Sequence, residues 1–185
     1  MIDENGVQTM PPVNANQGTV VAVCRNEKPG LPKPVVDEIT LIEDWGIEGD
    51  YHAGKLVRHR YLAKKDPTQP NIRQVLLIDT QILAEIKQEG IDISSGMFGD
   101  NMTVEGLNVM SIPLGTRLEV GEALLEVTEV RIPCSQLNGM DKRLLKASVT
   151  KEEGKKRFRA GIMARVLKSG RVRAGDQIVV HQQPY

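Results

Sequence analysis

Short segments rich in β-branched residues, separated by glycine-containing turns, constrain the fold of this chain more than any other feature. They are residues 19–24, 35–42, 73–78, 101–104, 116–120, 122–132, 161–167 and 176–181. Their length and composition are typical of β-strands. They do not alternate regularly with helices, which argues against a doubly wound parallel sheet. The sequence therefore predicts a mainly β protein, a barrel with a few short peripheral helices.

Two segments are predicted to be helical. Asp79 has the chemistry of an N-cap, the apolar residues at 82, 83 and 86 have helical spacing, and Gly90 supplies a stop. Residues 141–158 are predicted as a second helix with a basic face. The segment 55–72 is a longer excursion, rich in Lys and Arg. The family resemblance described below implies that this insertion lines or covers a site.

The chain of 185 residues is long enough for one domain with a substantial core. Residues 1–17 are polar and read as a flexible leader, and residues 18–185 as a single domain. No apolar run approaches the roughly 18 residues of a membrane span, and the acidic start has no secretory signal. Two cysteines, Cys24 and Cys134, give no disulfide framework, so we expect a cytoplasmic protein. The 3% aromatic content makes a nucleic-acid partner unlikely.

Charge is unevenly distributed along the chain although the formal net charge is zero. Residues 1–141 carry 12 Lys and Arg against 21 Asp and Glu, whereas residues 142–185 carry 12 against 3. The basic segment 142–173 is either an anion-binding face or a solvated surface that neutralises the acidic remainder.

Cys134 is the residue with the clearest chemical potential, in the run Arg131-Ile132-Pro133-Cys134. Pro133 removes a backbone donor, so the cysteine is expected to leave a regular strand and face a cleft. Arg131 could favour its thiolate form. The alternative stays open that this cysteine is a small apolar core residue. Cys24 shares a strand face with apolar neighbours and is expected in the core.

Two glycine-punctuated loops offer further polar groups. The loop 46–54 carries His52, whose imidazole can bind a metal, move a proton or donate to an anion. The loop 96–103 carries Asn101, which can both donate and accept hydrogen bonds. Ordinary turn chemistry would explain either loop as well. No phosphate-binding P-loop, dinucleotide fingerprint, HExxH or GxSxG motif is present.

Taken in order, these pieces resemble the MOSC domain, the C-terminal module of molybdenum cofactor sulfurases, over about residues 18–181. The matching segments are Gly30-Leu31-Pro32-Lys33, Gly46-Ile47-Glu48-Gly49-Asp50, His52-Ala53-Gly54, Arg73-Gln74-Val75-Leu76-Leu77, Phe98-Gly99-Asp100-Asn101-Met102-Thr103-Val104, Gly106-Leu107, Arg131-Ile132-Pro133-Cys134, Gly170-Arg171-Val172 and Gly175-Asp176. The family often has Glu-Asn-Leu-Thr where this chain has Asp100-Asn101-Met102-Thr103. The sulfurase's aminotransferase-like domain is missing here, so no pyridoxal phosphate is expected.

The resemblance implies a β-barrel that binds the molybdenum cofactor, molybdopterin, with Cys134 as the catalytic residue and metal ligand. It also implies cofactor contacts from Lys33, His52, Arg73, Asn101 and Arg131. In relatives that reduce N-hydroxylated compounds, the matching cysteine ligates molybdenum.

The leading hypothesis is accordingly a reductase component that takes electrons from separate donor proteins, because two cysteines cannot ligate a common iron–sulfur cluster. The first alternative is a non-enzymatic sulfur carrier that receives a persulfide on Cys134 from a sulfur-donor protein. The second is a barrel that only binds a partner protein.

Overall fold

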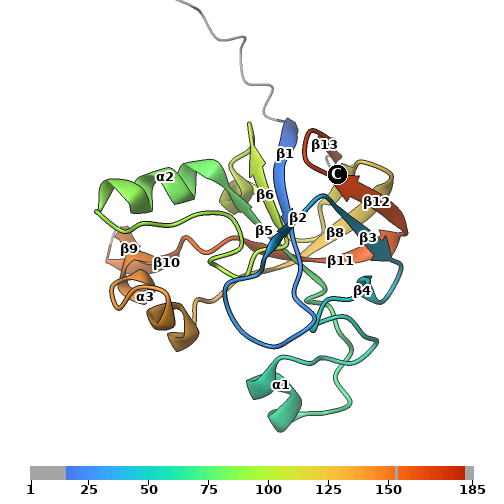
Figure 1. Cartoon of the computed structure of the whole chain (residues 1–185), viewed down its shortest axis with the longest axis horizontal. Helices are drawn as coiled ribbons and strands as arrows, with labels where there is room; N and C mark the ends of the chain where they lie inside the picture. Colours follow the sequence, from blue (N-terminus) through green and yellow to red (C-terminus); the bar gives the residue numbers. More distant parts are fainter. Residues whose placement is uncertain (1–15, 153, 182–185) are drawn as a thin grey trace, which may run out of the picture.

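The computed structural model describes residues 16–152 and 154–181, and its centre is a closed barrel of seven strands (Figure 1). In order around the barrel the strands are β13 (Gln177–His181), β7 (Arg117–Val120), β8 (Ala123–Val130), β11 (Ile162–Lys168), β5 (Val75–Asp79), β6 (Met102–Glu105) and β1 (Gln17–Cys24). Antiparallel pairing of β1 with β13, at Gln17 opposite Val179, closes the ring. The predicted mainly β barrel is therefore confirmed. Residues 1–15 of the predicted leader lie outside the described residues, and Gln17 already belongs to β1.

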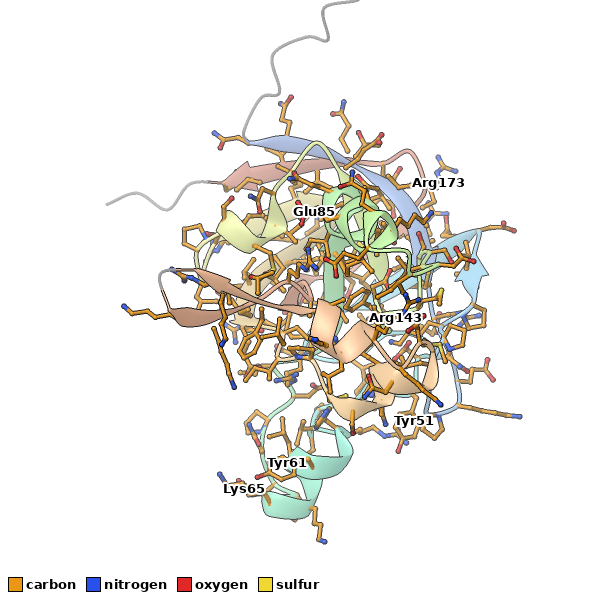
Figure 2. All side chains as sticks on the ribbon, turned by 90° about the vertical axis from the view of Figure 1, so that its left-hand side faces the viewer. Tyr51, Tyr61, Lys65, Glu85, Arg143 and Arg173 are labelled. Atoms are coloured by element: carbon orange, nitrogen blue, oxygen red, sulfur yellow. The ribbon has the colours of Figure 1, made fainter. Side chains whose placement is uncertain are left out.

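Smaller strands and helices surround this barrel. Of the remaining strands, β2 (Val35–Val36) pairs antiparallel with the end of β1. A second sheet contains β12 (Gly170–Arg173), β3 (Glu38–Ile42) and β4 (Gly46–Ile47), and β9 (Val149–Glu152) and β10 (Lys155–Phe158) form a hairpin. The helices are α1 (Arg60–Lys65), α2 (Thr80–Gln88) and α3 (Leu144–Ala147), with 3-10 turns η1 (Val109–Ser111) and η2 (Ser135–Gly139). Figure 1 shows α2, α3 and the β9–β10 hairpin on one side of the barrel and α1 at its lower end, and Figure 2 views the molecule from the side of α2 and α3.

The helix α2 forms where the sequence predicted it. The Asp79 side chain accepts a hydrogen bond from the Ile82 backbone N–H at 2.9 Å, which satisfies one of the free donors of the first turn. Ile82, Leu83 and Ile86 are buried on one face, and the chain returns to β6, which runs parallel to β5. A parallel pair needs such a crossover connection.

The predicted helix over residues 141–158 is wrong. Only α3 is helical there, and the following residues form the β9–β10 hairpin. Val149 and Thr150 are β-branched, and Gly154 adopts a φ of 77°, a left-handed conformation that ends a helix. The strand predicted over 35–42 is divided at Asp37 between two sheets, and β12 lies between the predicted strands 161–167 and 176–181, where no strand was predicted.

Two glycines bring the segments of the site together. At Gly161 an added Cβ would lie 2.1 Å from the carbonyl oxygen of Leu77, so β11 approaches β5 closely. The Gly161 carbonyl accepts the backbone N–H of Arg131 at 2.9 Å, which holds the segment after β8 near β5. At Gly96 an added Cβ would lie 2.0 Å from the carbonyl oxygen of Lys33. Both contacts require the absence of a side chain.

Candidate functional site

A cavity of about 380 Å³ lies at one end of the barrel, where five separate segments meet. It is lined by residues from the loop after β1, the segment 51–61, the beginning of β5, the loop before β6 and the segment after β8. The lining residues used below are Leu31, Lys33, Tyr51, His52, Arg58, His59, Tyr61, Arg73, Phe98, Asn101, Arg131, Ile132, Cys134 and Gln136. All six residues that the sequence indicated as site residues are among them.

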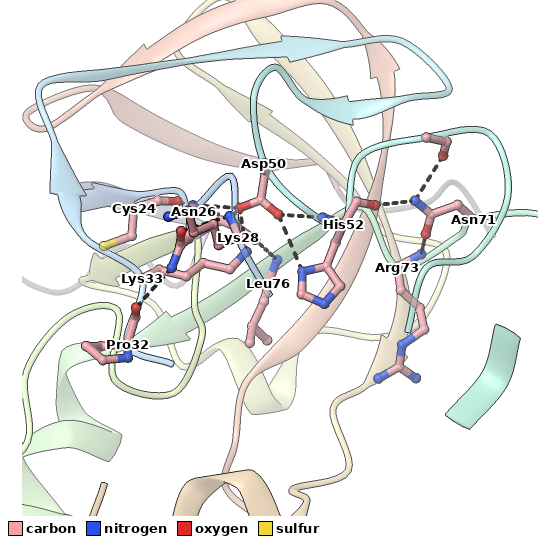
Figure 3. A network of polar contacts seen from close by, with 12 residues as sticks. Cys24, Asn26, Lys28, Pro32, Lys33, Asp50, His52, Asn71, Arg73 and Leu76 are labelled. Carbon is pink, nitrogen blue, oxygen red and sulfur yellow. Dashed lines mark hydrogen bonds and ion pairs between the residues drawn. The ribbon is translucent and has the colours of Figure 1, made fainter. Parts of the chain in front are cut away.

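Asp50 organises one wall of this cavity through a network of hydrogen bonds (Figure 3). Its Oδ2 accepts the Lys33 ammonium at 2.7 Å and the Asn101 side-chain amide at 3.2 Å. Its Oδ1 accepts the backbone N–H of His52 at 2.9 Å, and the His52 ring nitrogen Nδ1 lies 3.4 Å away. Asp50 was not among the predicted site residues, although it ends the glycine-rich motif that begins at Gly46.

The charges of this network are mutually stabilised. Burial alone would raise the pKa of Asp50, but the hydrogen bond from His52 and the charge of Lys33 hold it well below its ordinary value. Burial lowers the pKa of Lys33, which is only 4% exposed, and Asp50 opposes that shift. Both groups are charged at neutral pH because each compensates the other.

Asn101 connects three strands of the barrel rather than projecting freely into the cavity. Its Nδ2 donates to the Cys24 carbonyl at 3.0 Å as well as to Asp50, and its Oδ1 accepts the Leu76 backbone N–H at 3.2 Å. Both amide hydrogens are thus used inside the fold. Direct contact of Asn101 with a cofactor stays a prediction.

Arg131 is buried at the cavity and forms no ion pair among the described residues. Its side chain is 8% exposed, and within residues 16–152 and 154–181 its Nη1 has no hydrogen-bond partner. Its guanidinium lies over the ring of Phe98, 5.8 Å from the centroid, where the aromatic face attracts a cation. Burial lowers the pKa of Arg131, and the nearby Cys134 and Asp100 oppose this shift.

His59 belongs to the same wall and was missed by the sequence analysis. Its buried Nδ1 also lacks a hydrogen-bond partner among the described residues. Burial lowers its pKa, and the charges of Arg73, His52 and Arg131 lower it further. The only available signal was its place in the basic excursion 55–72, which the structure brings to the cavity as expected.

Two further arginines lie at the cavity in different circumstances. Arg73 forms an ion pair with Glu129, so much of its charge is neutralised. Arg58 lies over the ring of Tyr51, 4.7 Å from its centroid. The basic residues of α3 and of the β9–β10 hairpin do not line the cavity, so this part of the basic segment 142–173 is not an anion-binding face of the cavity.

The two cysteines differ sharply. Cys24 is buried in the core, and burial raises the pKa of its thiol to about 12. Cys134 lies just before η2, is partly exposed and lines the cavity, and its Sγ is 4.0 Å from Gln136 Oε1. Because the thiolate is the reactive form, Cys134 is the cysteine suited to ligation or covalent chemistry.

The fold and the cavity together define a class of protein: a β-barrel with a cationic pocket that contains one accessible thiol. The sequence matches the profile of the MOSC domain over residues 50–179. The chain belongs to the MOSC domain family, as the motif order indicated. No helix among the described residues is long and apolar enough to cross a membrane.

Several known proteins are similar in sequence to parts of this chain. Protein YiiM of Escherichia coli is 26% identical over 141 residues, which are 69% of this chain and 54% of that protein. A protein named "Reductase" from Gibberella moniliformis is 34% identical over 93 residues, or 49% of this chain and 16% of the relative. YflK of Bacillus subtilis, an uncharacterized protein, is 33% identical over 89 residues, 46% of this chain and 37% of its own length. The chain thus spans about half or less of these relatives.

Solved structures share the fold. The YUAD protein of Bacillus subtilis superposes with a TM-score of 0.76 at 20% identity, covering 91% of this chain and 97% of that one. YiiM from Geobacillus stearothermophilus gives a TM-score of 0.61 at 21% identity, covering 89% and 75%.

Proposed function

We propose that this chain binds the molybdenum cofactor, with Cys134 as a ligand of the metal, and acts as the reductase component for N-hydroxylated compounds. The observation that carries the proposal is the position of Cys134, whose accessible thiol shares one cavity with several cationic side chains. Membership of the MOSC domain family and similarity to a protein named "Reductase" support it.

The residues present fit such a cofactor. A thiolate is a soft, strongly donating ligand of the kind that transition metals with sulfur ligands take. No group of three or more His, Cys, Asp or Glu side chains that could hold a metal occurs in the described part of the chain, so a metal on Cys134 would bring other ligands with it. Lys33, Arg73 and Arg131 supply positive charge for a phosphate, and the ring edges of a pterin find donors and acceptors nearby.

When bound, the molybdenum centre supplies two-electron redox chemistry. The chain's own residues would bind the cofactor and orient the occupant of the cavity. Asp50 fixes the His52 ring through Nδ1, and Nε2 makes no hydrogen bond among the described residues, so it can exchange a proton with an occupant of the cavity. Reduction of an N–OH group to N–H consumes two electrons and two protons and releases water. Cys24 and Cys134 cannot ligate a common iron–sulfur cluster, so the proposal takes the electrons from a donor outside these 185 residues.

The test is metal and pterin analysis of protein purified natively from a host that makes the cofactor. We expect molybdenum and pterin in the wild-type protein and in Cys24→Ala, and loss of molybdenum in Cys134→Ala. Cys24→Ala is the matched control because it removes the other thiol without touching the cavity. Absence of both from wild-type protein, or equal molybdenum in wild-type protein and Cys134→Ala, would contradict the proposal.

A sulfur carrier is the second candidate, favoured by the partial exposure of Cys134 and its single weak contact with Gln136. A carrier would be purified with an added mass of about 32 Da on Cys134, removable by a reductant, and without molybdenum. That result would replace the reductase with the carrier.

A further inference from the structure

Arg131, which is buried, and His59, which is partly exposed, line the same cavity, and each has a buried nitrogen without a hydrogen-bond partner among the described residues. Only 8% of the Arg131 surface is exposed. Neither Nη1 of Arg131 nor Nδ1 of His59 has a hydrogen-bond partner within residues 16–152 and 154–181. An unpaired buried charge is strongly unfavourable unless a partner of opposite charge is supplied. Arg131 is such a charge, and the unpartnered Nδ1 of His59 lies at the same cavity, which indicates that the partner comes from outside the chain.

Three carboxylates interact with residues that line the cavity, and each is already engaged. Asp100 is fully buried, accepts the Gly96 backbone N–H at 2.9 and 3.0 Å and accepts the Thr103 hydroxyl at 2.8 Å. Glu129 is paired with the neighbouring Arg73.

The third nearby carboxylate is also used, since Asp50 accepts from Lys33, Asn101 and His52. None of the three carboxylates forms an ion pair with Arg131 among the residues described. An acceptor for Arg131 has to enter the cavity.

His59 occupies the N-cap position of α1, but its ring does not cap the helix. The groups that lower its pKa besides burial are Arg73, His52 and Arg131, which reach it from three different segments. In the empty cavity its imidazole is therefore neutral at neutral pH. An anion beside it would cancel the positive field that disfavours its protonated form.

We propose that Arg131 and His59 form a preformed binding site for an oxyanion, and that His59 takes up a proton from solvent when the anion binds. The guanidinium donates to the anion, and the imidazolium that forms donates its Nδ1 proton to the same anion. The oxyanion is either the phosphate of a cofactor or an acidic group of the substrate. This site needs no metal.

The experiment uses inorganic sulfate, which keeps its charge across about pH 5–8, and the full chain from a host unable to make the cofactor. Isothermal titration calorimetry in two buffers of different ionisation enthalpy measures affinity and proton uptake. Side-chain NMR follows the histidines, of which the chain has three. The variants are Arg131→Gln and His59→Gln, and Arg171→Gln is the control because that arginine is exposed and paired with Glu122.

We expect sulfate to bind wild-type protein and Arg171→Gln equally, and Arg131→Gln at least about tenfold more weakly. Binding should become tighter as the pH falls, because the bound state holds one more proton. Saturating sulfate should raise the pKa of His59, and proton uptake should vanish in His59→Gln. No sulfate binding, or unchanged affinity in Arg131→Gln, would overturn the site. Proton uptake that persists in His59→Gln would overturn the role of His59.

Repeating the titration with cofactor-loaded protein separates the two sources of the anion. If the loaded protein no longer binds sulfate, the subsite holds the cofactor's phosphate. If it still binds sulfate with the same dependence on Arg131, the subsite receives an acidic group of the substrate. Both results support the site. If the cofactor-free protein does not bind sulfate, the site is contradicted, whether or not the natively purified protein contains molybdenum.

Discussion

Two polar clusters line the same cavity and are built in opposite ways. Around Asp50, Oδ2 accepts three hydrogen bonds, one of them from the buried Lys33 ammonium at 2.7 Å. Oδ1 accepts one from the His52 backbone N–H, and the His52 ring nitrogen Nδ1 lies 3.4 Å from it. The guanidinium of Arg131 is also buried, but it lies over the aromatic ring of Phe98 instead of a carboxylate. Among the described residues, Arg131 Nη1 and His59 Nδ1 have no hydrogen-bond partner. The first cluster is complete within the chain and the second is not.

The difference separates scaffold from binding surface. A fully satisfied buried network rigidifies the segments that contribute to it, here the loops that carry Lys33, Asp50 and Asn101. A partly satisfied one lowers the stability of the empty protein and leaves hydrogen-bonding capacity for a ligand. Replacing a residue should therefore reduce stability in the Asp50 cluster and reduce binding in the Arg131 cluster. The predictions below test this division.

The largest expected effect is that of Asp50→Asn. Removing the carboxylate leaves the Lys33 charge buried without a counter-ion, which we expect to lower the free energy of unfolding by about 3 kcal/mol. The loss is limited because Lys33 can release its proton. Urea unfolding at pH 7 measures it, with Asp141→Asn as the control: Asp141 is paired with Arg143 at the surface, and its replacement should change stability little.

The same variant should change the pH dependence. The folded-state pKa of Asp50 lies below its unfolded value of about 3.9, so its stabilisation is complete above that pH and is lost as the pH falls through the folded value. Asp50→Asn should therefore lose less stability than the wild-type protein between about pH 4 and pH 2. If the two acid profiles are parallel, Asp50 does not have this role.

The next effect has the opposite sign. Arg131→Met removes an unpaired buried charge and keeps an apolar chain against Phe98, so we expect the cofactor-free variant to be as stable as the wild-type protein or up to about 2 kcal/mol more stable. Arg165→Met is the contrast, because Arg165 is paired with Glu126 and its loss should not stabilise the protein. A large destabilisation by Arg131→Met would show that Arg131 is a scaffold residue.

Much of this site could be predicted from the sequence, because its residues belong to contiguous motifs. Pro133 and the end of a strand placed Cys134 at a cleft, and Cys24 was expected in the core from its apolar strand face. The glycine loops offered His52 and Asn101 as candidates, and only the resemblance to the MOSC domain implied that they contact a cofactor. The barrel itself followed from strand length and turn spacing, and α2 from its cap and periodicity.

What could not be predicted depends on contacts between distant segments. That Asp50 pairs with Lys33 while Arg131 remains unpaired depends on where three separate loops meet. His59 lies in a basic excursion without a motif. The β9–β10 hairpin was predicted as a helix because its Lys and Arg residues favour helices locally, and tertiary context and Gly154 decided otherwise.

The smallest expected effect concerns Arg73. It belongs to neither cluster, because its charge is neutralised by Glu129. Glu129→Gln should lower the free energy of unfolding by less than about 1 kcal/mol, since the pair is only partly buried. It should also strengthen sulfate binding about two- to threefold, because the released charge of Arg73 adds to the positive field at the cavity. Calorimetric titration measures this gain, and it should shrink at high salt. Unchanged sulfate affinity would place Arg73 with the scaffold and leave the binding surface to Arg131 and His59.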